Sequence, residues 1–141
     1  MYKCPISKIN EFLTLVSKDY KVYVPVDAEK NRVVYKEFKD GTVISDALKT
    51  DRSAKDFFFP QSEDLMRFRT EGKNIEIIDD RKESEDFCVF GVRACDVKSI
   101  EVLDKVFLAE PVDTYYQNRR EHGVIISTAC SRPVETCFCN T

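Results

Sequence analysis

Apolar residues recur at helical spacing in the first stretch of the chain. Between Ile6 and Val16 they stand at positions 6, 9, 12, 13 and 16. Spacings of three and four residues are typical of a helix with one face toward a core. Ser7 lies near its start as a candidate N-cap. The pattern predicts a helix over 6–16.

The next two segments alternate or run β-branched and aromatic. They cover Tyr20–Val26 and Arg32–Phe38, and the polar stretch Asp27–Asn31 separates them. Two such runs around a short polar connection predict a β-hairpin. Asp40-Gly41 follows and favours a turn.

The middle of the chain has a less regular pattern. Ala54–Pro60 contains three consecutive phenylalanines, which we expect to be mostly core, with the proline ending the run. The residue pattern over Gln61–Arg69 predicts a short helix, and the pattern over Asn74–Ile78 predicts a strand. In that short helix, three apolar side chains should be partly buried: Leu65, Met66 and Phe68.

The last third alternates strand and helix patterns. Asp86–Val92 is nearly continuously apolar, as a strand covered on both faces tends to be. Asp96–Phe107 is helical, with Asp96 as its N-cap. Asp113–Glu121 is a more polar helix, and Gly123–Thr128 is the last strand. We expect the two strands to be neighbouring, central and parallel, joined by a right-handed crossover. The fold class is therefore α/β, one domain with a mixed sheet that contains a parallel βαβ pair and has helices packed on it.

Length, composition and charge limit the class of protein that the chain can be. A length of 141 residues suits one domain with a single core, which we take as 1–141. No apolar run approaches the ~20 residues that span a bilayer, and the start lacks the apolar region of a signal peptide. We expect a cytoplasmic protein without a membrane span. The net charge is −3 and the basic residues are scattered, so the chain lacks the basic patch of nucleic-acid-binding proteins.

Six cysteines are many for a cytosolic chain of this length. In a reducing compartment they favour metal binding or redox chemistry over a disulfide framework. Cys88 lies in an apolar strand and is expected to be a small buried hydrophobe, and Cys4 a surface thiol near the terminus. The other four are in the last third: Cys95, Cys130, Cys137 and Cys139.

The positions of these four cysteines predict one site. Cys95 follows the carboxyl end of one predicted strand, and Cys130 follows that of another, with Cys137 and Cys139 in the same loop as Cys130. In an open α/β sheet, ligands bind in the crevice outside such strand ends. Two distant segments would thus bring four thiols to one edge of the sheet.

Four thiolates are the usual ligand set of a [4Fe–4S] cluster. A helix N-terminus beside Cys95 favours the thiolate that metals require, and Arg93 and Arg132 can offset the charge of an anionic cluster. Zinc also takes four cysteines, although its sites usually use Cys-x₂₋₄-Cys pairs, which are absent. The spacing also departs from both common ferredoxin patterns, so spacing alone leaves the metal open.

Five ordered segments then resemble a known family. They span about residues 57 to 139, and a match in several elements is far more specific than one motif. The segments are Phe57-Phe58-Phe59-Pro60-Gln61-Ser62-Glu63, Phe90-Gly91-Val92-Arg93-Ala94-Cys95-Asp96, Leu103-Asp104-Lys105-Val106-Phe107, Asp113-Thr114-Tyr115-Tyr116 with Arg119-Arg120-Glu121, and Cys130-x-x-Pro133-x-x-Thr136-Cys137-Phe138-Cys139. They are similar to the electron-transfer subunits with two [4Fe–4S] clusters, which include the beta subunit of sulfhydrogenases and the corresponding iron–sulfur subunit of anaerobic sulfite reductase.

This resemblance implies that the chain is the amino-terminal domain of such an electron-transfer protein. In the family, the domain precedes a ferredoxin-like segment with two clusters. The whole protein passes electrons between a flavin subunit that uses a nicotinamide nucleotide and a catalytic subunit. The chain has no Cys-x₂-Cys-x₂-Cys run for those clusters, so we expect it to be part of a longer iron–sulfur subunit. The residue Ala94 stands where the family often has proline, which loosens the turn but leaves the cysteines in place.

Three functional classes stay open. The first is an electron-transfer domain that binds a [4Fe–4S] cluster and docks the flavin-containing and catalytic subunits. The second is a structural or interaction domain with zinc or without metal. The third is an independent enzyme with Cys95 beside Asp96 as nucleophile. It is the weakest because the single histidine, His122, is not placed as its base.

Overall fold

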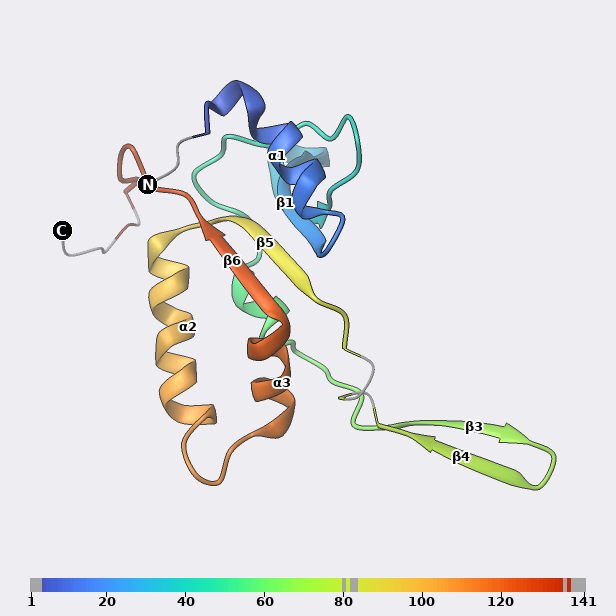
Figure 1. Ribbon diagram of the computed structural model, residues 1–141. Coiled ribbons are helices and arrows are strands. Elements are labelled where there is room, and N and C mark those ends of the chain that lie inside the picture. Colours follow the sequence, from blue (N-terminus) through green and yellow to red (C-terminus); the bar gives the residue numbers. More distant parts are fainter. Residues whose placement is uncertain (1–3, 80, 82–83, 136, 138–141) are drawn as a thin grey trace.

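The computed structural model describes residues 4–79, 81, 84–135 and 137. Its centre is a four-stranded sheet in the order β2-β1-β5-β6 (Figure 1). β1 and β2 are antiparallel, whereas β1–β5 and β5–β6 are parallel. The mixed sheet with a parallel βαβ pair is thus confirmed. The strands are β1 (Lys21–Ala28), β2 (Arg32–Glu37), β5 (Phe87–Val92) and β6 (Gly123–Ser127).

The predicted hairpin is β1 and β2. Their register runs from Tyr23 opposite Glu37 to Ala28 opposite Arg32. A three-residue 3₁₀ turn, Glu29–Asn31, joins them, and its last two residues have positive φ angles of 61° and 56°. That left-handed backbone lets so short a connection reverse the chain.

One face of the sheet packs against the first helix. α1 (Ile9–Val16) follows a 3₁₀ turn at Ile6–Lys8, so the predicted 6–16 helix is confirmed with a tighter first turn. Leu13 is completely buried against Val22 and Cys88. Cys88 is therefore the expected buried hydrophobe, and burial raises the pKa of its thiol.

The other face packs against α2 (Ala94–Phe107), α3 (Thr114–His122) and the 3₁₀ turn η3 (Ala54–Phe57). Phe58 is completely buried among Ile100, Tyr116 and Phe87. Phe57 is half-buried, and the exposed ring of Phe59 stacks on Phe107. The two faces follow from alternation along the strands, because successive side chains point to opposite sides.

The predicted helix over 61–69 is wrong. The segment bends and then forms β3 (Arg67–Glu71), which pairs with β4 (Asn74–Ile78) in a two-stranded ribbon that extends away from the main sheet (Figure 1). Gly72, at φ 61°, makes the reversal. Pairing with a strand only two residues away prevailed over the helical pattern. Three side chains expected to be partly buried are instead exposed: Leu65, Met66 and Phe68.

Two details of the last third also need correction. Arg93 is the N-cap of α2, and Asp96 lies in the first turn, where it accepts a hydrogen bond from Ser53 Oγ at 2.6 Å. β6 pairs parallel with β5 as predicted, but it ends the row of four described strands and is not central. Asp113 is the side-chain cap of α3 and accepts from two backbone amides.

In the described ranges, no helix is long and apolar enough to cross a membrane.

Candidate functional site

A cavity of about 600 Å³ lies at the carboxyl ends of β5 and β6, beside the start of α2. Its walls come from four places: the β5–α2 junction, the loop 47–53, the segment 129–133 together with Cys137, and the hairpin through Pro25 and Tyr35. Its volume is in the ordinary range of small-ligand sites. Its position is the one at which parallel sheets bind ligands.

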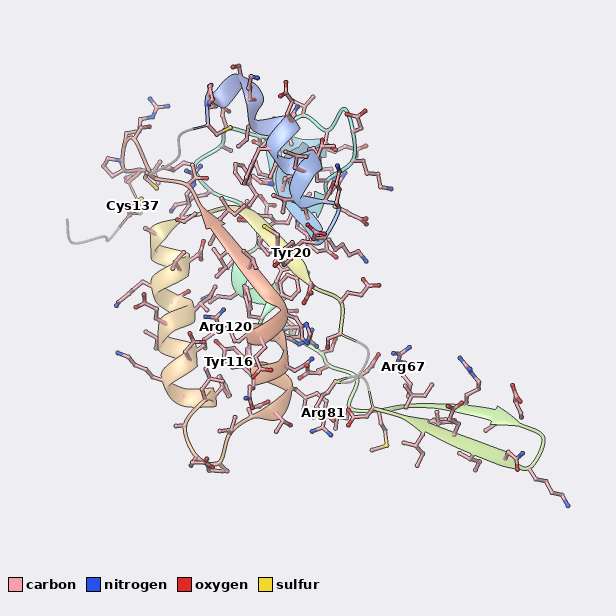
Figure 2. All side chains as sticks on the ribbon, in the orientation of Figure 1. Tyr20, Arg67, Arg81, Tyr116, Arg120 and Cys137 are labelled. Carbon is pink, nitrogen blue, oxygen red and sulfur yellow. The ribbon has the colours of Figure 1, made fainter. Side chains whose placement is uncertain are left out.

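The cavity collects three of the four predicted cysteines. Cys95 is the second residue of α2, and Cys130 follows the end of β6 by three residues. Both are exposed, and both line the cavity together with the half-buried Cys137. Figure 2 shows Cys137 beyond the ends of β6 and α2. Parallel pairing of β5 and β6 puts both turns at one edge, as the sequence predicted.

The remaining cysteines lie elsewhere. Cys139 is outside the described residues. Cys4 is exposed, Cys88 is buried, and neither lines the cavity. His122 ends α3, and its Nδ1 lies 2.6 Å from Asp86 Oδ1. It does not line the cavity. Ligation of a metal by Cys95, Cys130, Cys137 and Cys139 stays a prediction.

Gly91 shapes the turn that leads to Cys95. It has a φ of 83° and stands at an irregularity in the pairing of β5 with β6. A Cβ here would lie 3.1 Å from Cδ and Cγ of Pro25 in the neighbouring strand β1. The positive φ and this close approach of β1 to β5 both favour glycine at position 91. Beyond it, Thr128 N and Ser127 Oγ both donate to Val92 O at 2.9 Å. These bonds tie together the two strand ends that precede the cysteines.

Cationic side chains outnumber carboxylates among the described residues of the wall, which include Lys49, Arg93, Arg132 and Asp96. Tyr35 adds a phenol whose pKa is raised, chiefly by burial and next by the charge of Asp96, so at neutral pH it keeps its proton. The cavity therefore suits an anionic group bound through sulfur.

The residues present fit an iron–sulfur cluster in donor type and in charge. Among residues 4–79, 81, 84–135 and 137, no three histidine, cysteine or carboxylate side chains form a group that could hold a single metal ion. A cubane cluster differs from such an ion because its own width separates the thiolate sulfurs.

Sequence reasoning missed the loop 47–53 and Tyr35, which form much of the wall. These residues are more than 40 positions from Cys95, and nothing in their local pattern indicates a site. From the sequence, Arg93 was expected only to offset the charge of an anionic cluster. The structure gives Arg93 hydrogen bonds to carbonyl oxygens on two other segments.

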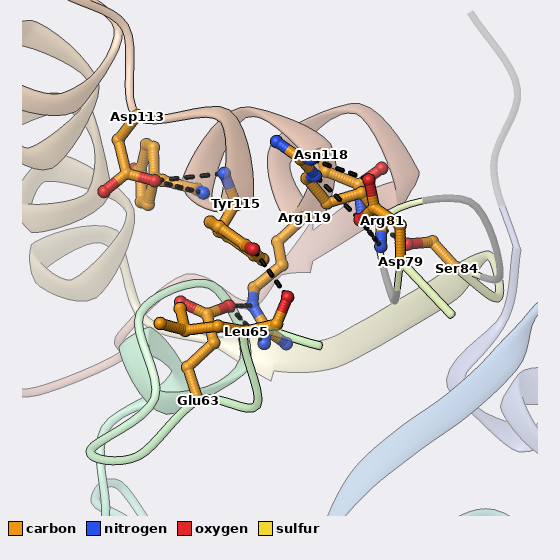
Figure 3. A network of polar contacts seen from close by, with 10 residues as sticks. Glu63, Leu65, Asp79, Arg81, Ser84, Asp113, Tyr115, Asn118 and Arg119 are labelled. Carbon is orange, nitrogen blue, oxygen red and sulfur yellow. Dashed lines mark hydrogen bonds and ion pairs between the residues drawn. The ribbon is translucent and has the colours of Figure 1, made fainter. Parts of the chain in front are cut away.

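A second, smaller cavity of about 380 Å³ lies at the base of the ribbon. A network of polar contacts surrounds it (Figure 3). Arg119 Nη2 lies 2.5 Å from Glu63 Oε1, and Arg81 Nη2 lies 2.6 Å from Asp79 Oδ2. Tyr115 Oη donates to Leu65 O at 2.6 Å. Each arginine here has a carboxylate partner, so the network fastens the ribbon to α3 rather than forming an anion site.

Comparison with known proteins supplies one match. Over 84 residues the chain is 38% identical to sulfhydrogenase 2 subunit beta of Pyrococcus furiosus. The resemblance to the sulfhydrogenase beta-subunit family is confirmed. The match covers 60% of this chain and 24% of that protein, so it spans about a quarter of the relative's length. No family model and no solved structure matches.

Proposed function

We propose that this beta-subunit-like chain is the amino-terminal domain of an electron-transfer subunit in a hydrogenase- or sulfite-reductase-like complex. It binds a [4Fe–4S] cluster through Cys95, Cys130, Cys137 and Cys139, and it docks the flavin-containing and catalytic subunits. The observation that carries the proposal is the lining of one cavity by three of these cysteines at the carboxyl ends of two parallel strands.

A bound cluster would supply one-electron transfer at a potential set by its surroundings. The chain's own residues determine those surroundings. Thiolates from α2 and from the loop after β6 hold the group, and the cations of the wall balance its charge. Pro25, Leu48 and Pro133 contribute apolar surface to the same wall. Burial and nearby charge are two main means by which proteins tune such a group.

A second candidate function is a docking module with zinc or without metal. The exposed apolar face of the ribbon favours it. Phe68 lies directly opposite Ile77, and Thr70 opposite Ile75, on one face of the two strands. The three apolar side chains are 69–74% exposed. An isolated two-stranded ribbon is marginal in water, so a partner that covers this face would stabilise it.

Anaerobic reconstitution with iron and sulfide separates the two candidates. The wild type and a Cys4→Ser control should bind about four irons per chain and absorb in the visible range. The double variant Cys137→Ser/Cys139→Ser should bind none, with unchanged far-ultraviolet circular dichroism, because Cys137 lies outside the described strands of the core. Iron, zinc and sulfide are measured on the same samples. The cluster proposal fails if the wild type retains no more iron than the double variant.

A further inference from the structure

Arg93 joins three segments around the cysteine cavity. It stands between β5 and α2 with an extended backbone (φ −82°, ψ 153°). Its Nη2 donates to Ala47 O at 2.8 Å, its Nε to Leu48 O at 3.1 Å, and its Nη1 to Ala129 O at 3.5 Å. One guanidinium thus connects the start of α2 with the loop after β2 and with the turn after β6.

These connections bear on the cysteines directly. Ala129 immediately precedes Cys130, and Arg93 precedes Cys95 by two positions. The loop 47–48 has no helix or strand of its own, and neither has the turn at 129–130. The side-chain bonds of Arg93 therefore add to the hydrogen bonds from Thr128 N and Ser127 Oγ to Val92 O in holding the two cysteine-bearing turns. The planar fork of arginine can reach three carbonyls, whereas the single nitrogen of lysine cannot span them.

The charge of Arg93 is a separate property. Its hydrogen-bond acceptors here are backbone carbonyls, which align dipoles but carry no full negative charge. Arg93 also lines the same cavity as Cys95, Cys130 and Cys137. A fixed positive charge stabilises nearby thiolates and favours the more reduced, more negative state of a group that they bind.

We propose that Arg93 is a positioning residue with two roles: it sets the separation of Cys95 and Cys130, and its charge raises the reduction potential of the cluster held there. The second role rests on the proposed function. The first role concerns the chain alone and can be tested without iron.

Three variants separate geometry from charge. Arg93→Gln removes both the fork and the charge, and Arg93→Lys keeps only the charge. Arg132→Gln is the matched control, because Arg132 also lines the cavity but belongs to the segment after Cys130. Circular dichroism and a thermal scan first establish that each variant is folded.

The first readout is amide hydrogen exchange over 44–50 and 128–133 in the metal-free chain. Both Arg93 variants should exchange about tenfold faster there than the wild type, since bonds to a charged donor are lost. Arg132→Gln should exchange like the wild type. Wild-type exchange in Arg93→Gln overturns the positioning role, whether or not the protein binds iron.

The second readout uses the reconstituted protein. Iron loss to a chelator should be about tenfold faster in both Arg93 variants. The midpoint potential should fall in Arg93→Gln and stay near the wild-type value in Arg93→Lys. An unchanged potential in Arg93→Gln overturns the charge role. A wild type that binds no iron overturns the proposed function and the charge role with it, while the exchange result still decides the positioning role.

Discussion

The two sheets in the described part of this protein contrast in what covers them. The four-stranded sheet has helices on both faces, and Phe58 beside it is completely buried. The ribbon of β3 and β4 has a regular register, yet Phe68 is 74% exposed. Strand pairing and burial are therefore separate properties: a turn and backbone bonds suffice for the first, whereas the second needs a neighbouring layer.

The two regions are also held by different forces. Around the main sheet, Phe57 and Phe58 pack against Phe87 with ring centroids 6.2 and 5.4 Å apart. At the ribbon, the attachment consists of polar bonds at its base, such as Arg119 to Glu63. Burial of aromatic surface contributes more than exposed ion pairs do. Matched substitutions in the two regions should therefore differ widely in cost.

The largest difference is expected between two phenylalanines. Phe58→Ala should lower the free energy of unfolding by about 3–5 kcal/mol, because it leaves a cavity in the core. Phe68→Ala should change it by less than about 0.5 kcal/mol, as exposed substitutions usually do. Urea unfolding followed by circular dichroism measures both. A comparable loss in Phe68→Ala would mean that the ribbon packs against the body in solution.

Two glycines give the next contrast. A Cβ at Gly123 would lie 2.7 Å from Phe87 Cζ and 2.8 Å from the carbonyl oxygen of Arg119. Gly123→Ala should therefore cost about 1–3 kcal/mol through overpacking. Gly72 in the ribbon turn has open space around it and a φ of 61°, which asparagine adopts readily. Gly72→Asn should cost less than about 0.5 kcal/mol. Thermal unfolding measures both variants. Equal melting temperatures would contradict the expected difference in stability between Gly123→Ala and Gly72→Asn.

The smallest contrast concerns two acids. Burial acts to raise the pKa of Asp104, but hydrogen bonds from Arg120 and Tyr116 outweigh it, so the pKa is lowered. The folded state therefore gains stability from this carboxylate above its ordinary pKa and loses it as the pH falls through the lowered value. Asp104→Asn should cost about 1.5 kcal/mol at pH 7 and progressively less as the pH falls through that window.

Glu76 on the ribbon is the control for this comparison. It lies opposite Arg69 and is exposed. Glu76→Gln should change stability by less than about 0.5 kcal/mol at neutral pH. Urea midpoints measured from about pH 7 down to about pH 3, across the ordinary carboxyl range, compare the two variants. An Asp104→Asn variant with the same pH profile as the wild type would exclude this carboxylate as a source of the acid sensitivity.

The sequence by itself determined most of the local structure and the neighbourhood of the candidate site. Periodicity placed the helices over 9–16 and 94–107 and the strands around 21–37, 87–92 and 123–127 within a few residues. The position of Cys95 and Cys130 just after two strands predicted that they share an edge. The first inference works because helical and strand patterns depend on residues close together in the chain. The second works because a strand–helix–strand succession usually gives parallel strands, whose carboxyl ends lie at one edge of the sheet.

Tertiary structure alone decided the rest. The apolar side chains of Leu65, Met66 and Phe68 suit a buried helix or an exposed strand equally, and pairing of 67–71 with β4 decided between them. Tyr35 and the loop 47–53 line the cavity although they stand more than 40 residues before Cys95. Arg93 bonds to Ala47, Leu48 and Ala129, which are all more than 30 residues away from it. Such contacts leave no local pattern, because they depend on which surfaces the folded chain brings together and not on the spacing of neighbouring residues.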